Sequence, residues 1–373
     1  MDDFQFWEHN GAGNNATKSN RVEAYPEQVM LQLTSRCNLS CWHCVRSLTA
    51  TRGCDAPKAL IDYVVRRILP HSSYLRVGGD GIGEPLLAGH FTYFFSTMRK
   101  DNLKEVHLIT NLTLLDEQKA ELIAAQVDNI EISVEGTGEH YSRIRHFPWD
   151  RIVENIKMLD RSRRKNPAST LKITLLVCTI VHNLENLMTV FDLKEIGVDR
   201  VIFREFQPVV RKQDAASLSR DLVKTQWFIQ HCEARARQTG IDIDIGFKDK
   251  YAKYGGGMIT PGTPPALKDC FFPWTCISIR SSGALSSCCC LNDLAQLKNY
   301  EEDFLSVWNS KAFIRIRDRV NDARPWRDCA RCEIKTGHLS DEEKARLLGK
   351  SNHLHWLKKS SPWIQFFTVL RNL

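Results

Sequence analysis

The sequence lacks an apolar run of about 18 residues, so we expect no membrane-spanning helix. It also lacks the basic and then apolar pattern of a signal peptide, because its first twenty residues are polar and acidic. A strong charge of either sign is missing too. The net charge of +7 over 373 residues fits an anionic substrate or cofactor but does not argue for nucleic acid. We therefore expect a cytoplasmic protein that binds no nucleic acid.

Cysteine, in contrast, is abundant, with 13 residues. Their clustered spacing and the missing signal peptide favour metal sites in a reducing compartment over disulfides. Cys178 and Cys232 are exceptions, because their surroundings are apolar or helical and predict core positions. The chain is long enough for one large domain with a sizeable core and a smaller second domain.

The densest cysteine group is the octapeptide Cys-Asn-Leu-Ser-Cys-Trp-His-Cys at 37–44. Its thiols are too close in sequence for a helix or strand between them, so the loop must curl with the sulfurs facing inward. Such a cage suits a soft metal or an iron–sulfur cluster. Three ligands leave one iron of a four-iron cluster open to a small molecule. A zinc knuckle is the alternative, but it needs a fourth ligand nearby.

This octapeptide resembles the CxxxCxxC signature of the radical S-adenosylmethionine (SAM) superfamily, with His43 in the aromatic-type position. The resemblance implies a four-iron cluster held by Cys37, Cys41 and Cys44, whose open iron is chelated by SAM. It also implies an external one-electron reductant of the flavodoxin or ferredoxin type. In that family the reduced cluster splits SAM into methionine and a 5′-deoxyadenosyl radical, which takes a hydrogen atom from the substrate.

Strand-like and helix-like segments alternate over residues 26–208, after a polar lead-in at 1–25. Strands are expected at 29–33, 75–77, 106–109, 130–134, 171–180 and 201–203, and helices at 59–69, 91–100, 116–126, 149–165 and 184–196. Repeated βα units predict an α/β fold with a parallel sheet that closes fully or in part. This pattern resembles the partial (β/α)6 TIM barrel of radical SAM enzymes.

In parallel barrels the chemistry gathers at the carboxyl ends of the strands. After the second strand, Gly83-Glu84-Pro85 resembles the family's Gly-Gly-Glu-Pro motif, which implies that Gly83 and Glu84 bind the amino group of SAM. An ordinary β-turn with an exposed glutamate is the alternative. After the third strand, Thr110-Asn111-Leu112 resembles Thr-Asn-Gly and makes Asn111 a cofactor-binding candidate, with leucine in the glycine position.

Ser133 and Glu135 end the fourth strand and project to one side, because they are two residues apart. They match the family's Ser-x-Asp-Gly, which faces the SAM carboxylate and ribose. Arg145 ends a stretch that resembles one in the family and could pair with the methionyl carboxylate; a solvated arginine is the alternative. Glu205 is a candidate substrate contact or base, since an unpaired carboxylate inside a barrel is costly without a task. An outward ion pair is its alternative.

Residues 209–265 predict a connecting helix at 214–238, a strand at 241–247 and a Gly/Pro-rich linker. Over 266–335 a β-hairpin, a helix at 304–320 and a late CxxC resemble the auxiliary-cluster domain called SPASM, or twitch in its shorter form. The resemblance implies one auxiliary [4Fe-4S] cluster held by Cys270, Cys288, Cys329 and Cys332. A zinc ribbon on the same thiols is the alternative. The cysteines left unassigned are Cys276, Cys289 and Cys290.

The tail at 336–373 carries aromatic residues among basic ones. We expect a helical tail packed against the barrel, with a membrane-surface helix as the alternative.

Three functions are compatible with these motifs. The first is radical oxidation of a small polar molecule such as a sugar or aminocyclitol, with the auxiliary cluster accepting an electron. The second is epimerisation of a sugar or peptide by a cysteine hydrogen donor, and the third is non-catalytic electron transfer. Only 36 residues precede Cys37, too few for a leader-peptide-binding domain, which favours a small-molecule substrate over a peptide.

Overall fold

The computed structural model describes residues 20–48, 53–78, 82–208, 211–252, 269–288, 292–322, 325–326, 329 and 332. Predictions about residues 1–19, the linker at 253–268, Cys289, Cys290 and the tail at 336–373 lie outside the described residues.

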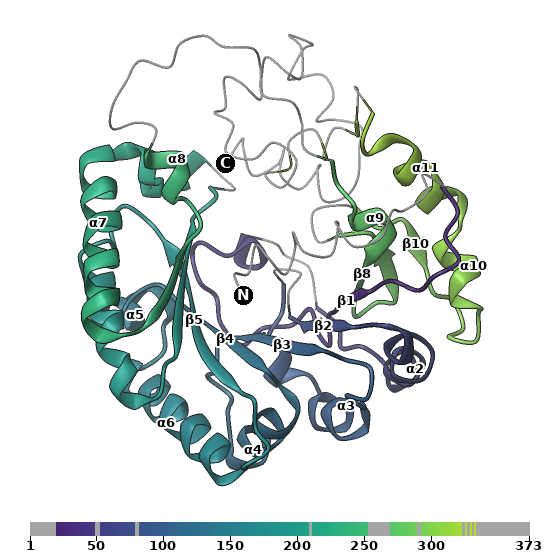
Figure 1. Ribbon diagram of the computed structural model, residues 1–373, viewed down its shortest axis with the longest axis horizontal. Helices are drawn as coiled ribbons and strands as arrows, with labels where there is room; N and C mark the ends of the chain where they lie inside the picture. The colour runs from purple at the N-terminus through teal and green to yellow at the C-terminus, as the bar shows by residue number, and fades with distance from the viewer. Residues whose placement is uncertain are drawn as a thin grey trace.

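One curved sheet organises the described chain, and Figure 1 shows its strands fanning around a common interior. The strands are β1 (Gln28–Leu31), β2 (Tyr74–Val77), β3 (Glu105–Thr110), β4 (Asn129–Val134), β5 (Lys172–Thr179), β6 (Arg200–Glu205), β7 (Asp242–Ile245), β8 (Cys276–Ile279), β9 (Ala284–Ser286) and β10 (Ala295–Gln296). Their order is β10-β9-β8-β1-β2-β3-β4-β5-β6-β7. Neighbours from β8 through β1 to β7 run parallel, whereas β9 and β10 add an antiparallel hairpin.

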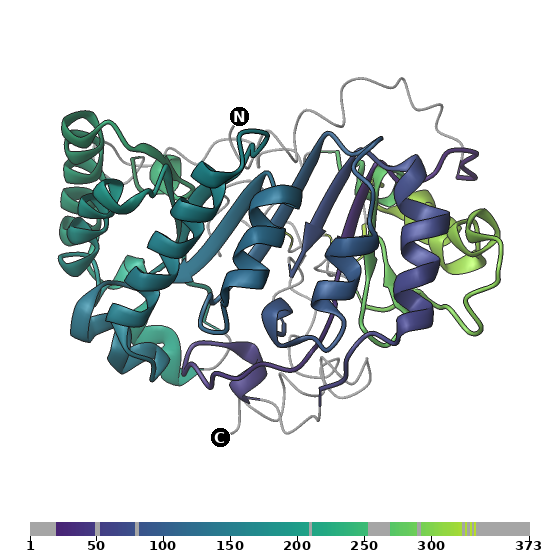
Figure 2. The same cartoon turned by 90° about the horizontal axis from the view of Figure 1, so that it is seen from below.

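Helices cover the outer face of this sheet, and the view in Figure 2 has several of them in front of the strands. The α-helices are α2 (Lys58–Tyr63), α3 (Phe91–Thr97), α4 (Glu117–Gln126), α5 (Gly138–Arg145), α6 (Trp149–Lys165), α7 (Leu222–Thr239), α8 (Lys248–Ala252), α9 (Phe272–Thr275), α10 (Phe304–Trp308) and α11 (Lys311–Arg319). The 3₁₀ helices are Val45–Leu48, Leu69–His71, Pro85–Leu87, Asn186–Ile196, Arg211–Ala216 and Leu218–Arg220, and a π-helical turn spans Val64–Ile68. In the described part of the chain, none of these helices is long and apolar enough to cross a membrane.

Local sequence explains where the helices begin and what they bury. Asp116 caps α4 by accepting from the backbone N–H of Lys119, and this leaves fewer unpaired amides in the first turn. Along α6, Ile152, Ile156 and Leu159 recur at helical spacing and are fully buried against the sheet. The main core therefore lies between the outer face of the strands and the helices.

The α/β fold with a partial parallel barrel is as predicted, and so is the C-terminal hairpin followed by helices. The tertiary structure adds two strands to the barrel wall, because β7 pairs with β6 and β8 pairs with β1. Four helix predictions need correction. The segment at 304–320 divides into α10 and α11 around Asn309-Ser310, and the segment at 184–196 is 3₁₀ in geometry. The segment at 214–238 becomes the α-helix α7 only from Leu222, and the segment at 59–69 continues after α2 as a π-helical turn.

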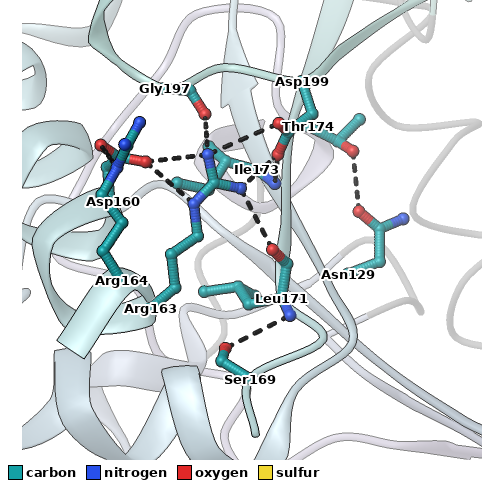
Figure 3. Close-up of polar contacts among 10 residues, drawn as sticks. All are labelled: Asn129, Asp160, Arg163, Arg164, Ser169, Leu171, Ile173, Thr174, Gly197 and Asp199. Carbon is teal, nitrogen blue, oxygen red and sulfur yellow. Dashed lines mark hydrogen bonds and ion pairs between the residues drawn. The ribbon is translucent and has the colours of Figure 1, made fainter. Parts of the chain in front are cut away.

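A charged network ties α6 to the loops at the amino ends of β5 and β6 (Figure 3). Arg163 pairs with Asp160 and Asp199, and its guanidinium also donates to the carbonyls of Leu171 (3.1 Å) and Gly197 (2.8 Å). Asp199 in turn accepts from the N–H of Ile173 at 2.8 Å. This network lies at the amino ends of the strands, opposite to the end that carries the cysteine loop and Glu84, so it stabilises the barrel without entering the candidate site.

Candidate active site

The cysteine loop follows β1 and curls as its spacing predicted. Cys41 is buried and Cys37 and Cys44 are partly buried. The Cys44 N–H donates to the Cys41 carbonyl at 3.1 Å, and the Leu39 N–H lies 3.4 Å from Cys37 Sγ. Burial is the main cause that raises the pKa of Cys37 and that brings the pKa of Cys41 to about 11.

The three thiols belong to one short loop, and a polynuclear group bound there would hold them as thiolates. Amide donors aimed at a sulfur are a further feature of iron–sulfur sites. Within the described residues, no three Cys, His, Asp or Glu side chains converge tightly enough to hold a single metal ion. Three thiols on one loop, one of them accepting from an amide N–H, are a donor set whose chemistry fits the cluster that the motif implied.

The loop after β2 packs directly against the start of the cysteine loop. Gly83 has φ +92°, and a Cβ there would lie 1.9 Å from the Thr34 carbonyl oxygen. Only glycine allows this approach of two backbones. The Glu84 N–H then donates to the Arg36 carbonyl at 2.8 Å, one residue before Cys37. The glycine of this motif therefore holds the Glu84 loop in register with the cysteine loop.

The carboxylate of Glu84 is buried, so the exposed-turn alternative is wrong. It accepts from Thr110 Oγ1 at 2.5 Å and from the N–H groups of Asn111 (2.7 Å) and Leu86 (3.0 Å). Burial raises its pKa, although these three donors oppose the shift. Since a carboxylate has about four acceptor positions, roughly one is left for a ligand.

Asn111 lies between the third strand and the cysteine loop. Its amide nitrogen is 3.2 Å from Asn38 Oδ1 and 3.8 Å from Cys37 Sγ. Leu112, in the family's glycine position, keeps the left-handed backbone with φ +62°, and Asn155 donates to its carbonyl at 2.8 Å. The leucine thus preserves the glycine-type turn that orients Asn111, at a backbone cost of about 1 kcal/mol.

Glu135 and Arg145 form a buried ion pair, so the solvated alternative for Arg145 is wrong. Arg145 Nε donates to Glu135 Oε2 at 2.6 Å, and a second nitrogen meets Oε1. His43 Nε2, in the cysteine loop, lies 3.2 Å from Glu135 Oε1. Burial alone would raise the pKa of Glu135, but Arg145 and then His43 lower it to about 2. The pair therefore connects α5, β4 and the cysteine loop.

Ser133 and Glu135 do share one face of β4, as their spacing predicted. Ile130, Ile132 and Val134 point into the helix-covered core, so the other residues face the interior of the barrel. Ser133 is half-buried on that face.

The prediction that Glu205 is a substrate contact or base needs correction. It shares the face of Val201 and Phe203, which pack in the helix-side core, and so points away from the interior. It is paired rather than alone, because Lys250 Nζ donates to Oε2 at 2.7 Å and Tyr251 OH donates to Oε1 at 2.6 Å. The outward ion pair is therefore what the fold contains.

Cys178 is a residue that sequence reasoning misplaced. Its neighbours Leu175 and Val177 belong to the helix-side core, but Cys178 alternates with Val177 and faces the interior, beside Arg204 of β6. It is half-buried against Ile180, Phe206 and Ala216. Burial is the main cause that raises the pKa of its thiol. Glu135 and Cys41 raise this pKa further, and Arg145 lowers it. Two-residue alternation along β5 was the signal that could have found it. Cys232, in contrast, is buried on α7 as expected.

The interior below these residues is polar. Arg76 of β2 pairs with Glu131 of β4 at 2.7 Å, and His107 of β3 lies between Glu131 (3.2 Å) and Glu105 (2.8 Å). Nearer the carboxyl ends, Arg204 of β6 pairs with Asp244 of β7 at 2.7 Å. The charged side chains in this part of the barrel interior thus lie beside groups of opposite charge.

The second cysteine set also assembles in part. Cys270, Cys288 and Cys329 all pack around Ile316 and Val320 of α11. The Cys332 N–H lies 3.3 Å from the Cys329 carbonyl. Gly283 turns the hairpin between Cys270 and Cys288 with φ +82°. Cys276 is fully buried beside Met30, while Cys289 and Cys290 lie outside the described residues. Three of the four proposed auxiliary ligands therefore share one apolar cluster.

Two family models match the chain where the cysteine sets lie. Residues 31–193 match the radical SAM superfamily and residues 270–333 match the SPASM iron–sulfur cluster-binding domain. A curated relative, "Probable GTP 3′,8-cyclase" of Methanococcus maripaludis, is 25% identical over 114 residues, which are 28% of this chain and 35% of the relative. The match thus spans about a third of that relative's length.

Two solved structures resemble the fold. Streptococcus suis SuiB bound to S-adenosylmethionine has a TM-score of 0.57 at 15% identity, over 79% of this chain and 68% of SuiB. A structure of anSMEcpe with bound AdoMet has a TM-score of 0.57 at 17% identity, over 78% of this chain and 79% of that one. SuiB has also been solved with its precursor peptide SuiA.

Proposed function

Since this chain belongs to the radical SAM superfamily and carries a SPASM iron–sulfur domain, we propose that it oxidises a small polar molecule such as a sugar or aminocyclitol. The cofactors of these domains are SAM, its [4Fe-4S] cluster and an auxiliary cluster. When bound, SAM and its cluster supply a radical that removes hydrogen from a carbon of the substrate.

The observation that carries the proposal is the position of the auxiliary cysteines. β8 follows Cys270 in the chain and pairs with β1, which leads directly into the Cys37 loop. Both cysteine sets are therefore attached to neighbouring parallel strands, the Cys37 loop after the carboxyl end of β1 and Cys270 before the amino end of β8. Oxidation of a C–H bond next to a hydroxyl leaves a carbon radical that must lose a proton and an electron. A second electron-accepting group on the adjacent strand gives that electron a destination.

Within this proposal, Cys37, Cys41 and Cys44 hold the SAM cluster, and Cys270, Cys288, Cys329 and Cys332 hold the auxiliary one. The remaining acceptor position of Glu84 suits the ammonium group of SAM. Ser133 faces the interior beside it. Glu135 and Arg145 have a positioning role, because each is the other's main partner and Glu135 also holds His43 in place.

The barrel interior supports a polar substrate. Arg204 and Asp244 are both partly exposed on the inner face, with 31% and 18% of their side chains accessible. The guanidinium donates and the carboxylate accepts, so adjacent hydroxyl or amino groups of one molecule could bind both. A peptide remains the competing substrate class, and assays should include peptides alongside sugars and aminocyclitols.

A second function, epimerisation, is favoured by Cys178. A hydrogen-atom donor must be a protonated thiol that faces the substrate, and Cys178 is half-buried on the inner face with a raised pKa. Its S–H hydrogen would pass to the substrate carbon, and the external one-electron reductant together with a proton would restore the thiol. Cys276, considered from sequence as a donor, is enclosed beside Met30 and Phe272.

The first experiment is anaerobic reconstitution followed by dithionite reduction with SAM. We expect about eight irons per chain and release of 5′-deoxyadenosine. Replacing Cys37, Cys41 and Cys44 together with alanine should abolish SAM cleavage and leave about four irons. An electron carrier would cleave no SAM, and zinc at the second site would contradict the auxiliary cluster.

The second experiment distinguishes the two reactions in heavy water. An oxidase should form product without deuterium at the reacting carbon and should tolerate Cys178→Ala. An epimerase should incorporate one deuterium and should lose turnover in that variant. Cys232→Ala, a buried cysteine on the distant α7, is the matched control.

A further inference from the structure

Arg317 is a buried cation in the auxiliary domain. Only 3% of the residue is exposed on α11. Its Nε donates to the Pro273 carbonyl at 2.7 Å, and Nη1 lies 3.2 Å from the Asn20 carbonyl and 3.4 Å from Asn309 Oδ1. The guanidinium also lies 4.5 Å from the centre of the Trp308 ring. All of these partners are neutral.

The charge of Arg317 has no carboxylate counterpart among the residues that the structure describes. Its Nη2 is buried there without a hydrogen-bond partner. Burial is the cause that lowers the pKa of Arg317 to about 10, so the side chain is still a cation at neutral pH. A buried charge is costly unless an opposite charge lies near it. An anion nearby would account for an arginine here.

The auxiliary cysteines become anionic when they hold a cluster, and the segments that carry them contact α11 and the residues just after it. Asn321, just after the end of α11, exchanges two hydrogen bonds with the backbone of Cys270. Ile316, the residue before Arg317, packs in the cluster that contains Cys329. Pro273, which accepts from Arg317, follows Cys270 by three residues. The helix that carries Arg317 is therefore also the support of the auxiliary cysteines.

We propose that Arg317 compensates the negative charge of the auxiliary four-iron cluster and thereby increases its tendency to accept an electron. The inference rests on the proposed function, in which that cluster takes the electron lost by the substrate radical. Four thiolates make the cluster anionic, and one-electron reduction adds a further negative charge. A fixed cation close by favours the reduced form, and net charge around a cluster is one of the factors that set its potential.

The test measures the midpoint potential of the auxiliary cluster by a redox titration followed by electron paramagnetic resonance. The full-length chain carries Cys37→Ala, Cys41→Ala and Cys44→Ala, so that one cluster remains. In this background Arg317→Gln removes the charge but keeps an amide donor, and Arg317→Lys keeps the charge but loses the planar fork. Arg315→Gln is the matched control, because Arg315 lies on the same helix and is exposed.

We expect Arg317→Gln to shift the midpoint to a more negative value, by about 59 mV for each tenfold loss in electron affinity. Arg317→Lys should stay near the parent, and Arg315→Gln should match it. A parent midpoint in Arg317→Gln with about four irons retained would overturn the inference. If Arg317→Gln does not retain the cluster, the iron content of Arg317→Lys distinguishes a charge role from a structural one. Retention by lysine supports a charge role, whereas equal loss in both variants shows that Arg317 is only a structural tie and overturns it.

Failure of the proposed auxiliary cluster itself would look different. The parent with the three alanines and an intact Arg317 would then contain zinc or no iron, before any change at Arg317.

Discussion

The buried pair of Glu135 and Arg145 should contribute far more to stability than a surface pair. Breaking a buried ion pair by removing one partner typically costs about 3–5 kcal/mol, because the other charge stays buried. The pKa of Glu135 leads to a similar figure. Its lowering from 4.5 to about 2 corresponds to about 3 kcal/mol of stability. Because the folded pKa is lowered, this contribution is present above pH 4.5 and is lost as pH falls towards 2.

The assay is urea unfolding of apo-protein, followed by circular dichroism under anaerobic conditions. We expect Glu135→Gln and Arg145→Met each to lower the unfolding free energy by about 3 kcal/mol at pH 7. The double variant should cost less than the sum, since no lone charge remains. Arg151→Met is the control. Arg151 and Glu154 form an exposed pair at 3.7 Å, which should contribute no more than about 1 kcal/mol.

Two results would refute this reasoning. One is that either single variant costs no more than Arg151→Met. The other is that the double variant costs as much as the two single variants together, which would mean that the charges do not interact. In reconstituted protein, Glu135→Gln should also release iron to a chelator faster, because His43 loses its anionic partner.

Three further predictions follow from local geometry. Gly83→Ala should lower both the melting temperature and the iron content, because its Cβ would collide with the Thr34 carbonyl; Gly138→Ala, with open space around it, is the milder control in the same thermal melts. Arg163→Met should destabilise the barrel by about 1–3 kcal/mol in urea, whereas Arg164→Met, at an exposed position, should have little effect. For His107, burial alone would lower the pKa, but Glu105 and Glu131 raise it to about 9. Its stabilisation is therefore present below pH 6.5 and lost as pH rises through 9, and His107→Gln should flatten that part of the unfolding profile.

The local spacing of residues in the sequence was enough to predict the cysteine loop, most strands and helices, and which neighbouring side chains share a face. The spacing of three cysteines within eight residues, together with the family resemblance, was enough to predict a cysteine loop after the first strand. Apolar residues at every second or every third to fourth position placed the strands and helices of the barrel. Ser133 and Glu135 share a face for the same reason, because strand geometry alone sets it.

Contacts between elements that are distant in the sequence could be recognised only in the folded protein. Residues ten apart, Glu135 and Arg145, became partners because α5 folds back over the end of β4. Glu205 turned outward and Cys178 inward, because the register of β5 and β6 against the helices sets which face is buried. β8 joined β1 across some 250 residues of chain, and that pairing attaches the domain of the second cysteine set to the wall of the barrel. Such contacts depend on long-range burial and backbone pairing, whose free energies appear only once the distant segments are packed together.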